Sequence, residues 1–296
     1  MMGKNGMIKW VVLLSVFLFT ATAFAGGHGH GAKKDIKKGI LLVAFGSSIP
    51  EAQVAFINIA KQVKKEFKGV PIRWAYTSVI IRNKLKKQGQ ILDSVAMALA
   101  KMKDDGFSHV AVQSLHTIRG EEFEDLEKTV NAFAHLPDGF EKIIVGNPLL
   151  SSQKDIEKTA DAIIANIPKK RKKKEAVVLM GHGSPHPSNA FYTALMFNLQ
   201  KKDKNIFVGT VEGAPEVDEI SIMLKKANIK KAYLMPFMSV AGDHARNDMA
   251  GDEDDSWKSI LTKEGIKCET VLKGTAEYNN MIAIWTGHLK DVMAHF

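Results

Sequence analysis

The sequence predicts an α/β protein of two similar lobes, each a four-stranded parallel sheet flanked by helices. Three observations predict it: short apolar runs alternate with longer segments of helical periodicity, the alternation occurs about eight times, and the last four units resemble the first four. Such alternation favours parallel strands joined by right-handed helical crossovers. A chain of 296 residues is long enough for two domains of this size.

The expected strands are short apolar runs bounded by polar residues or glycine. They span residues 39–45, 70–77, 108–115, 141–145, 175–181, 205–211, 231–237 and 267–272. Intervening segments such as 51–67 and 91–103 place apolar residues three and four apart, which is the pattern of a helix packed on a sheet.

The two halves align at three places in order. Residues 42–47 match 179–184, so that Phe45 falls on His182. Two further matches place Ser78 on Glu212 and Glu122 on His244. A (β/α)8 barrel is the competing architecture, because it also has eight repeats. Either fold puts the active site at the carboxyl ends of the strands, and the halving favours two lobes.

The first 25 residues predict a secretory signal peptide. Lys4 and Lys9 precede an apolar run from residue 10 to 19, and Ala23-Phe24-Ala25 forms a small-x-small cleavage site. A transmembrane anchor needs about 20 consecutive apolar residues, and this run is interrupted at Thr20. We expect the mature chain to begin near Gly26 in a periplasm, with no later membrane span and a flexible His/Gly-rich and Lys-rich start over 26–38.

The formal net charge of +9 favours an anionic ligand. Part of the excess lies in the basic run 169–174, which lacks interleaved aromatic residues and is therefore interpreted as a solvated linker rather than a nucleic-acid site. It separates an expected N-terminal lobe, 39–168, from a C-terminal lobe, 175–296. The only cysteine, Cys268, is expected to be a buried small hydrophobe.

Three loops of the C-terminal lobe present a donor side chain directly after a predicted strand. These donors are His182, Glu212 and His244, and glycine flanks each of them. Because parallel strands bring such loops to one edge of the sheet, the three side chains are expected to lie together. Two imidazoles and a carboxylate suit a divalent transition metal and leave positions open for a substrate. The sequence thus predicts a metal centre that is also catalytic.

The first lobe offers candidate contacts for a ligand held opposite this centre. Phe45, Ser47 and Glu122 occupy the loops that correspond to the donor loops. His116 also follows a predicted strand, and a contact to a metal or macrocycle and a loop-capping role are equally open for it. Two features are weaker. The histidines of 26–31 either collect metal or belong to an unstructured start. The acidic run 252–255 favours a helix start, and attraction of cations by these residues is the open alternative.

The chain resembles the class II tetrapyrrole chelatases, and most closely the CbiK-type anaerobic sirohydrochlorin cobalt chelatases. The resemblance covers nearly all of the expected mature chain and is specific only as a set of motifs. These are residues 41–48, 114–116 with 120–122, 180–184, 211–213, and 241–244 with 247–251. It implies a tetrapyrrole between two lobes, with His182, Glu212 and His244 as metal ligands. The signal peptide departs from a family of biosynthetic enzymes.

The resemblance implies insertion of Co2+, or Fe2+, into sirohydrochlorin with release of two protons, and His182 and His244 are expected to accept them. Arg82, Lys84 and Arg119 are expected to contact macrocycle carboxylates. The alternative is a periplasmic haem or cobalt binding and transport protein on a chelatase fold, with bound haem and a transport partner. An exported nickel or iron chelatase and a homo-oligomeric state also stay open.

Overall fold

The computed structural model describes residues 36–296, which form one compact unit. The predicted signal peptide and most of the expected flexible start lie outside the described residues. Lys38, placed in that start by the sequence, already begins the first strand. No helix in the described part of the chain is long and apolar enough to cross a membrane.

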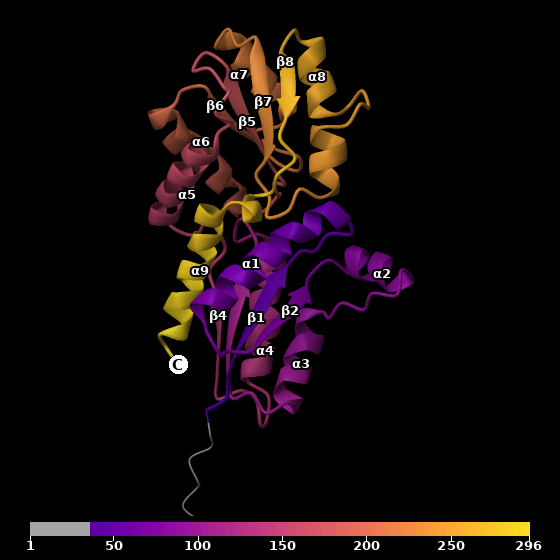
Figure 1. The fold of residues 1–296 in the computed structure, drawn as a ribbon, viewed down its shortest axis with the longest axis vertical. Helices are drawn as coiled ribbons and strands as arrows, with labels where there is room; N and C mark the ends of the chain where they lie inside the picture. The colour runs from indigo at the N-terminus through magenta and orange to yellow at the C-terminus, as the bar shows by residue number, and fades with distance from the viewer. Residues whose placement is uncertain (1–35) are drawn as a thin grey trace, which may run out of the picture. The chain divides into compact units, whose positions relative to one another are not determined.

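Eight strands form two separate four-stranded parallel sheets, which confirms the predicted fold class and excludes a closed barrel (Figure 1). The first sheet has the order β2-β1-β3-β4, with β1 (Lys38–Ala44), β2 (Ile72–Tyr76), β3 (His109–Ser114) and β4 (Lys142–Gly146). The second has the order β6-β5-β7-β8, with β5 (Ala176–Gly181), β6 (Ile206–Thr210), β7 (Lys231–Pro236) and β8 (Lys267–Thr270). The two orders are the same, so the repeat read from the sequence is a structural repeat.

Strands β1 and β5 are apolar along most of their length because helices cover both faces of each sheet. From Ile40 to Ala44 every side chain is buried, and the same holds from Ala176 to Met180. One continuous apolar cluster includes residues of both sheets, such as Leu42 and Leu179. The lobes therefore share a core.

Nine α-helices of the described chain connect or cover the strands. They are α1 (Gln53–Glu66), α2 (Val79–Lys87), α3 (Val95–Asp104), α4 (Glu121–Ala134), α5 (Gln153–Asn166), α6 (Ala190–Lys202), α7 (Val217–Lys226), α8 (Trp257–Lys263) and α9 (Asn279–Met293). The side-chain oxygens of Ser78, Ser94, Ser152 and Ser256 accept a backbone N–H in the first turn of the following helix. Such caps satisfy donors that a helix start leaves unpaired.

Helix packing differs from the domain boundaries expected from chain order. Helix α5 comes before the basic run yet packs on α6, and α9 ends the chain yet packs against β3 and β4 (Figure 1). The ammonium groups of Lys38 and Lys142 donate to the carbonyls of Phe296 and His295, which fixes the C-terminus on the first lobe. Each lobe is thus completed by a helix from the other half of the chain.

The basic run 169–174 is not uniformly solvated. Its lysines are exposed, but the Arg171 side chain is only 5% exposed and pairs with Asp203. Lys170 and Lys231 both contact Glu269, at 2.5 and 2.6 Å, and their hydrogen bonds lower the pKa of that carboxyl to about 2. The run is therefore anchored to the second lobe through these contacts, which the sequence pattern did not reveal.

Candidate metal centre

The loops that carry His182 and Glu212 are held together through their backbones. The amide of Glu212 donates to the His182 carbonyl at 2.7 Å. Gly183 has φ +83°, and a Cβ there would lie 2.5 Å from the Glu212 carbonyl oxygen. Only glycine permits both this backbone conformation and this approach. The glycine after His182 is therefore required to bring the two donor loops into contact.

His182 and His244 lie beside each other at the carboxyl ends of β5 and β7. Their ring centroids are 4.8 Å apart and the rings are nearly perpendicular, at 89°. Glu212 Oε2 lies 3.8 Å from His182 Nδ1. The side chains of His182, His244 and Glu212 are 38%, 35% and 57% exposed, so all three are accessible to a ligand from solvent.

Both imidazoles use Nδ1 for a contact within the protein. His182 Nδ1 donates to the Gly183 carbonyl at 3.1 Å, because a carbonyl oxygen can only accept. His244 Nδ1 lies 2.5 Å from Asp248 Oδ2, four residues further along the short helical turn η3 (Ala245–Met249). Such outer partners fix the ring orientation and leave Nε2 to bind a metal. Asp248 is thus a positioning residue that sequence reasoning did not single out, although its spacing from His244 was visible.

The three donors do not form a closed ligand set in this structure. Within residues 36–296 no group of three or more His, Cys, Asp or Glu side chains is arranged to hold a metal ion. The Glu212 carboxylate approaches the Nδ1 side of His182 rather than its Nε2 side. A metal bound by all three residues requires a new rotamer of this exposed carboxylate. An open donor set of this kind fits a metal that arrives and leaves as a substrate.

The three candidate contacts of the first lobe differ in their surroundings. The ring of Phe45 is 6.4 Å from that of His182 and is tilted by 48°. Ser47 is buried, and its Oγ accepts the Ile49 amide, so it braces the Phe45 loop. Glu122 is exposed in the first turn of α4, and its side chain makes no hydrogen bond in the described structure. Phe45 alone of the three faces a donor ring.

His116 is built into the loop after β3. Its Nδ1 lies 2.8 Å from Ser114 Oγ, and its carbonyl accepts the Leu149 amide at 2.9 Å and the Trp285 indole N–H at 3.3 Å. Burial lowers the pKa of the imidazole to about 4, so His116 is neutral near pH 7. Its Nε2 is buried without a partner among the described residues. The loop-capping role is visible, and Nε2 is the atom left for a ligand.

Two contacts that the sequence did not suggest join the lobes near the site. His186 Nε2 lies 3.0 Å from Glu124 of α4, and the Arg246 guanidinium lies 3.8 Å from Glu51. Arg119, expected to meet a macrocycle carboxylate, instead makes two 2.8 Å hydrogen bonds to Glu127. Its charge is therefore compensated within α4 and its flanking loop.

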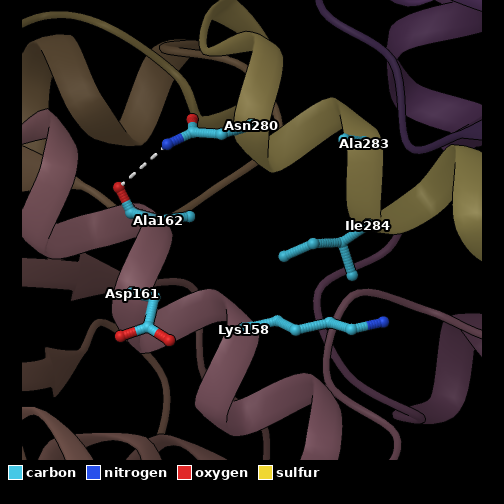
Figure 2. A pocket seen from close by; sticks show the side chains of 6 residues that line it. All are labelled: Lys158, Asp161, Ala162, Asn280, Ala283 and Ile284. Atoms are coloured by element: carbon cyan, nitrogen blue, oxygen red, sulfur yellow. Dashed lines mark hydrogen bonds between the residues drawn. The ribbon is translucent and has the colours of Figure 1, made fainter.

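One hollow lies away from these donors, between α5 and α9 (Figure 2). It measures about 440 Å³ and is lined by Lys158, Asp161, Ala162, Asn280, Ala283 and Ile284. The Asn280 amide reaches across it to the Ala162 carbonyl at 3.4 Å, while the Lys158 and Asp161 side chains point in opposite directions (Figure 2). It offers no convergent set of donors, so the candidate site stays with the histidines.

The chain matches a known protein family along nearly all of its described length. Residues 38–294 match the family model described as cobalt chelatase (CbiK). The chain belongs to the CbiK cobalt chelatase family. It is 45% identical over 253 residues to sirohydrochlorin cobaltochelatase CbiKC of Nitratidesulfovibrio vulgaris, covering 86% of this chain and 89% of that protein. It is 34% identical over 260 residues to sirohydrochlorin cobaltochelatase of Salmonella typhimurium, covering 87% and 97%.

Solved structures support the fold of this family. SirB from Bacillus subtilis with Fe3+ superposes with a TM-score of 0.59 at 15% sequence identity, covering 88% of this chain and 96% of that one. At such low identity the likeness shows the shared two-lobed fold alone. The match to the CbiK family spans both lobes and includes the loops of His182, Glu212 and His244. The three donor loops therefore lie within the region that the family model covers.

Proposed function

We propose that this protein inserts Co2+ into sirohydrochlorin and releases two protons. The observation that carries the proposal is the pair His182 and His244, whose Nδ1 atoms are engaged within the protein and whose Nε2 atoms are left for a metal. The choice of sirohydrochlorin as macrocycle and cobalt as metal is supported by membership of the CbiK family and by relatives named sirohydrochlorin cobaltochelatase.

In this mechanism the macrocycle lies against Phe45 with one face toward the two histidines. The metal is a substrate, held first by His182 and His244 with Glu212 as the third donor. Binding that bends the ring exposes the pyrrole nitrogen lone pairs to the metal. Of the ring nitrogens that bind the metal, the two that carry a proton lose it, so two protons leave as one dication enters. The histidines and Glu212 are partly exposed, which allows them to pass these protons to solvent.

The test is an assay of multiple turnover with metal-free sirohydrochlorin and Co2+. Metal insertion is measured by the change that it causes in the absorption spectrum of the macrocycle. We expect the catalysed rate to exceed the uncatalysed rate with enzyme far below substrate in concentration. Parallel reactions with Fe2+, Ni2+ and protoporphyrin measure selectivity. A rate with Co2+ and sirohydrochlorin no faster than the rate in buffer would contradict the proposal.

Fe2+ belongs to the proposal as a second substrate metal, because two imidazoles and a carboxylate bind both ions and affinity order alone does not decide between them. The alternative of a haem or cobalt carrier stays a prediction, as do a transport partner and a homo-oligomer. A haem absorption band in the freshly purified protein, together with stoichiometric rather than repeated metal insertion, would favour the carrier.

We also propose that the protein is exported to a periplasm by cleavage after residue 25. Support comes from the charged start, the apolar run and the Ala23-Phe24-Ala25 site. Mass spectrometry of the protein from a fractionated bacterial host is expected to show a periplasmic chain that begins at Gly26. An intact N-terminus in the cytoplasmic fraction would contradict export and would leave the proposed chemistry untouched.

A further inference from the structure

Helix α2 has no counterpart in the second lobe. In the first lobe the chain leaves β2 at Tyr76, forms α2, and begins α3 only at Val95. In the second lobe it leaves β6 at Thr210 and begins the corresponding helix α7 at Val217. Figure 1 shows α2 beside the carboxyl end of β2 and apart from the helices that cover the sheet. The repeat thus carries one extra helix, and it lies at the edge that holds the site.

The start of α2 is fixed to the loop that faces His182. The Ser78 amide donates to the Phe45 carbonyl at 3.2 Å, and Ser78 Oγ caps the helix by accepting the Ile81 amide. A Cβ at Gly46 would meet Ile81 at 3.2 Å, so this turn packs closely on the Phe45 loop. The first turn of α2 therefore lies next to the ring that stands opposite the donors.

Two large apolar side chains in this turn face solvent. Val79 is 58% exposed and Ile80 is 78% exposed, although Leu85 on the opposite face of the helix is buried. Residues i and i+4 share a helix face, so Lys84 continues the exposed row that Ile80 begins. Apolar groups exposed beside a binding edge are a mark of ligand contact.

Helix α2 is basic and uncompensated. Residues 79–92 contain Arg82, Lys84, Lys86 and Lys87 and no acidic residue. None of these four side chains makes an ion pair in the described structure, whereas Arg119, Arg171 and Lys231 do. Arg82 Nε is in addition buried without a hydrogen-bond partner among residues 36–296. A carboxylate of a ligand would supply the acceptor that this buried guanidinium nitrogen lacks.

We propose that α2 is a binding arm for the edge of a polycarboxylate macrocycle: Val79 and Ile80 cover its apolar rim, and Arg82 and Lys84 bind its carboxylates. The inference rests on the proposed function, because sirohydrochlorin joins a flat apolar ring to several carboxylates. Charge complementarity selects this occupant: the helix carries only positive charge, and its apolar residues stand beside Phe45. In this proposal the second lobe carries the metal donors, and the first lobe makes the contacts that bind the edge of the macrocycle.

The decisive measurement is the Kd of metal-free sirohydrochlorin, determined by fluorescence titration. The variant Lys84→Glu/Lys87→Glu reverses two exposed charges of α2, and Lys172→Glu/Lys173→Glu makes the same change in the exposed basic run. We expect the α2 variant to raise Kd and KM for the macrocycle about tenfold, as loss of charge-assisted contacts predicts, with kcat within about twofold and KM for Co2+ unchanged. Raised salt should weaken binding by the wild-type protein more than binding by the α2 variant.

The apolar part of the arm has its own matched pair. Ile80→Ser removes the exposed side chain of α2, and Ile222→Ser removes a 66% exposed isoleucine of α7 in the other lobe. Only the first is expected to raise the Kd of the macrocycle. Equal Kd values for α2 variants and their controls would overturn the proposed arm. If the wild-type protein binds the macrocycle but inserts no metal, the proposed function fails while the titration still decides the role of α2.

Discussion

Replacing His182 or His244 by alanine is expected to lower kcat for cobalt insertion at least about 100-fold, because each change removes a proposed metal donor that is also the proposed proton acceptor. The fold should persist, since both side chains are partly exposed and neither belongs to the apolar core. Steady-state insertion rates with sirohydrochlorin, together with circular dichroism spectra of the purified variants, check both halves of the expectation.

Two further variants calibrate this result. Asp248→Asn keeps a side chain of similar size at His244 Nδ1 but weakens the contact that orients the ring, so a loss of about tenfold or more is expected, as for other partners of metal-binding histidines. His135→Ala is the matched control, because His135 is an exposed histidine at the end of α4 whose side chain hydrogen-bonds only to the Asn131 carbonyl in the described structure. Near-normal insertion by purified His182→Ala or His244→Ala would remove these residues from the metal centre.

The fold was accessible from the sequence because its signals are local and repeated. Eight apolar runs became eight strands with ends displaced by at most two residues, and the alignment of Phe45 with His182 reflects two sheets of the same strand order. Glycines with positive φ at Gly46 and Gly183 sit at the same point of each repeat. A backbone requirement of that kind leaves a mark in sequence.

Other features depend on tertiary packing that the chain order does not encode. Helix α9 is amphipathic like its neighbours, and nothing in its pattern indicates that it covers the first sheet while α5 joins the second lobe. Arg171 looks like one of six similar basic residues until Asp203, far along the chain, is placed beside it. The rotamer of Glu212 cannot be read from the sequence either. The sequence therefore identified the three donor loops but not whether their side chains converge on one point.

Helices α5 and α9, each of which packs on the lobe formed by the other half of the chain, are joined by a buried ion pair. Loss of this pair is expected to have the largest effect on stability. His288 Nε2 of α9 lies 3.0 Å from Asp155 Oδ1 of α5, and the two residues are 8% and 5% exposed. His288 Nδ1 lies 3.1 Å from the Asn147 carbonyl, so both ring nitrogens face acceptors and both donate. Ser151 and Ser152 each donate to the other carboxylate oxygen at 2.7 Å. Every polar atom of the pair is thus satisfied.

We expect His288→Ala to lower the free energy of unfolding by about 3 to 5 kcal/mol at pH 7, because it leaves a buried carboxylate without its cation. Urea denaturation measures this value. Asp155→Ala should cost about as much, and the double variant should cost less than the two single changes added together, since the pair acts as one unit. The control Asp161→Ala breaks the exposed pair with Lys202 and is expected to change stability by less than about 1 kcal/mol.

The effect should depend on pH in a direction set by Asp155. Burial alone would raise the pKa of this carboxyl, but hydrogen bonds from Ser152, Ser151 and His288 outweigh it and hold the pKa below its usual range. A lowered native pKa contributes stability that is complete above the unfolded value of about 3.9 and is lost as pH falls through the native value. The difference between wild type and His288→Ala should therefore shrink below about pH 4, where protonation removes the unpaired charge. A difference that stays constant from pH 7 to pH 3 would show that packing of the imidazole, not its charge, holds α9 to α5.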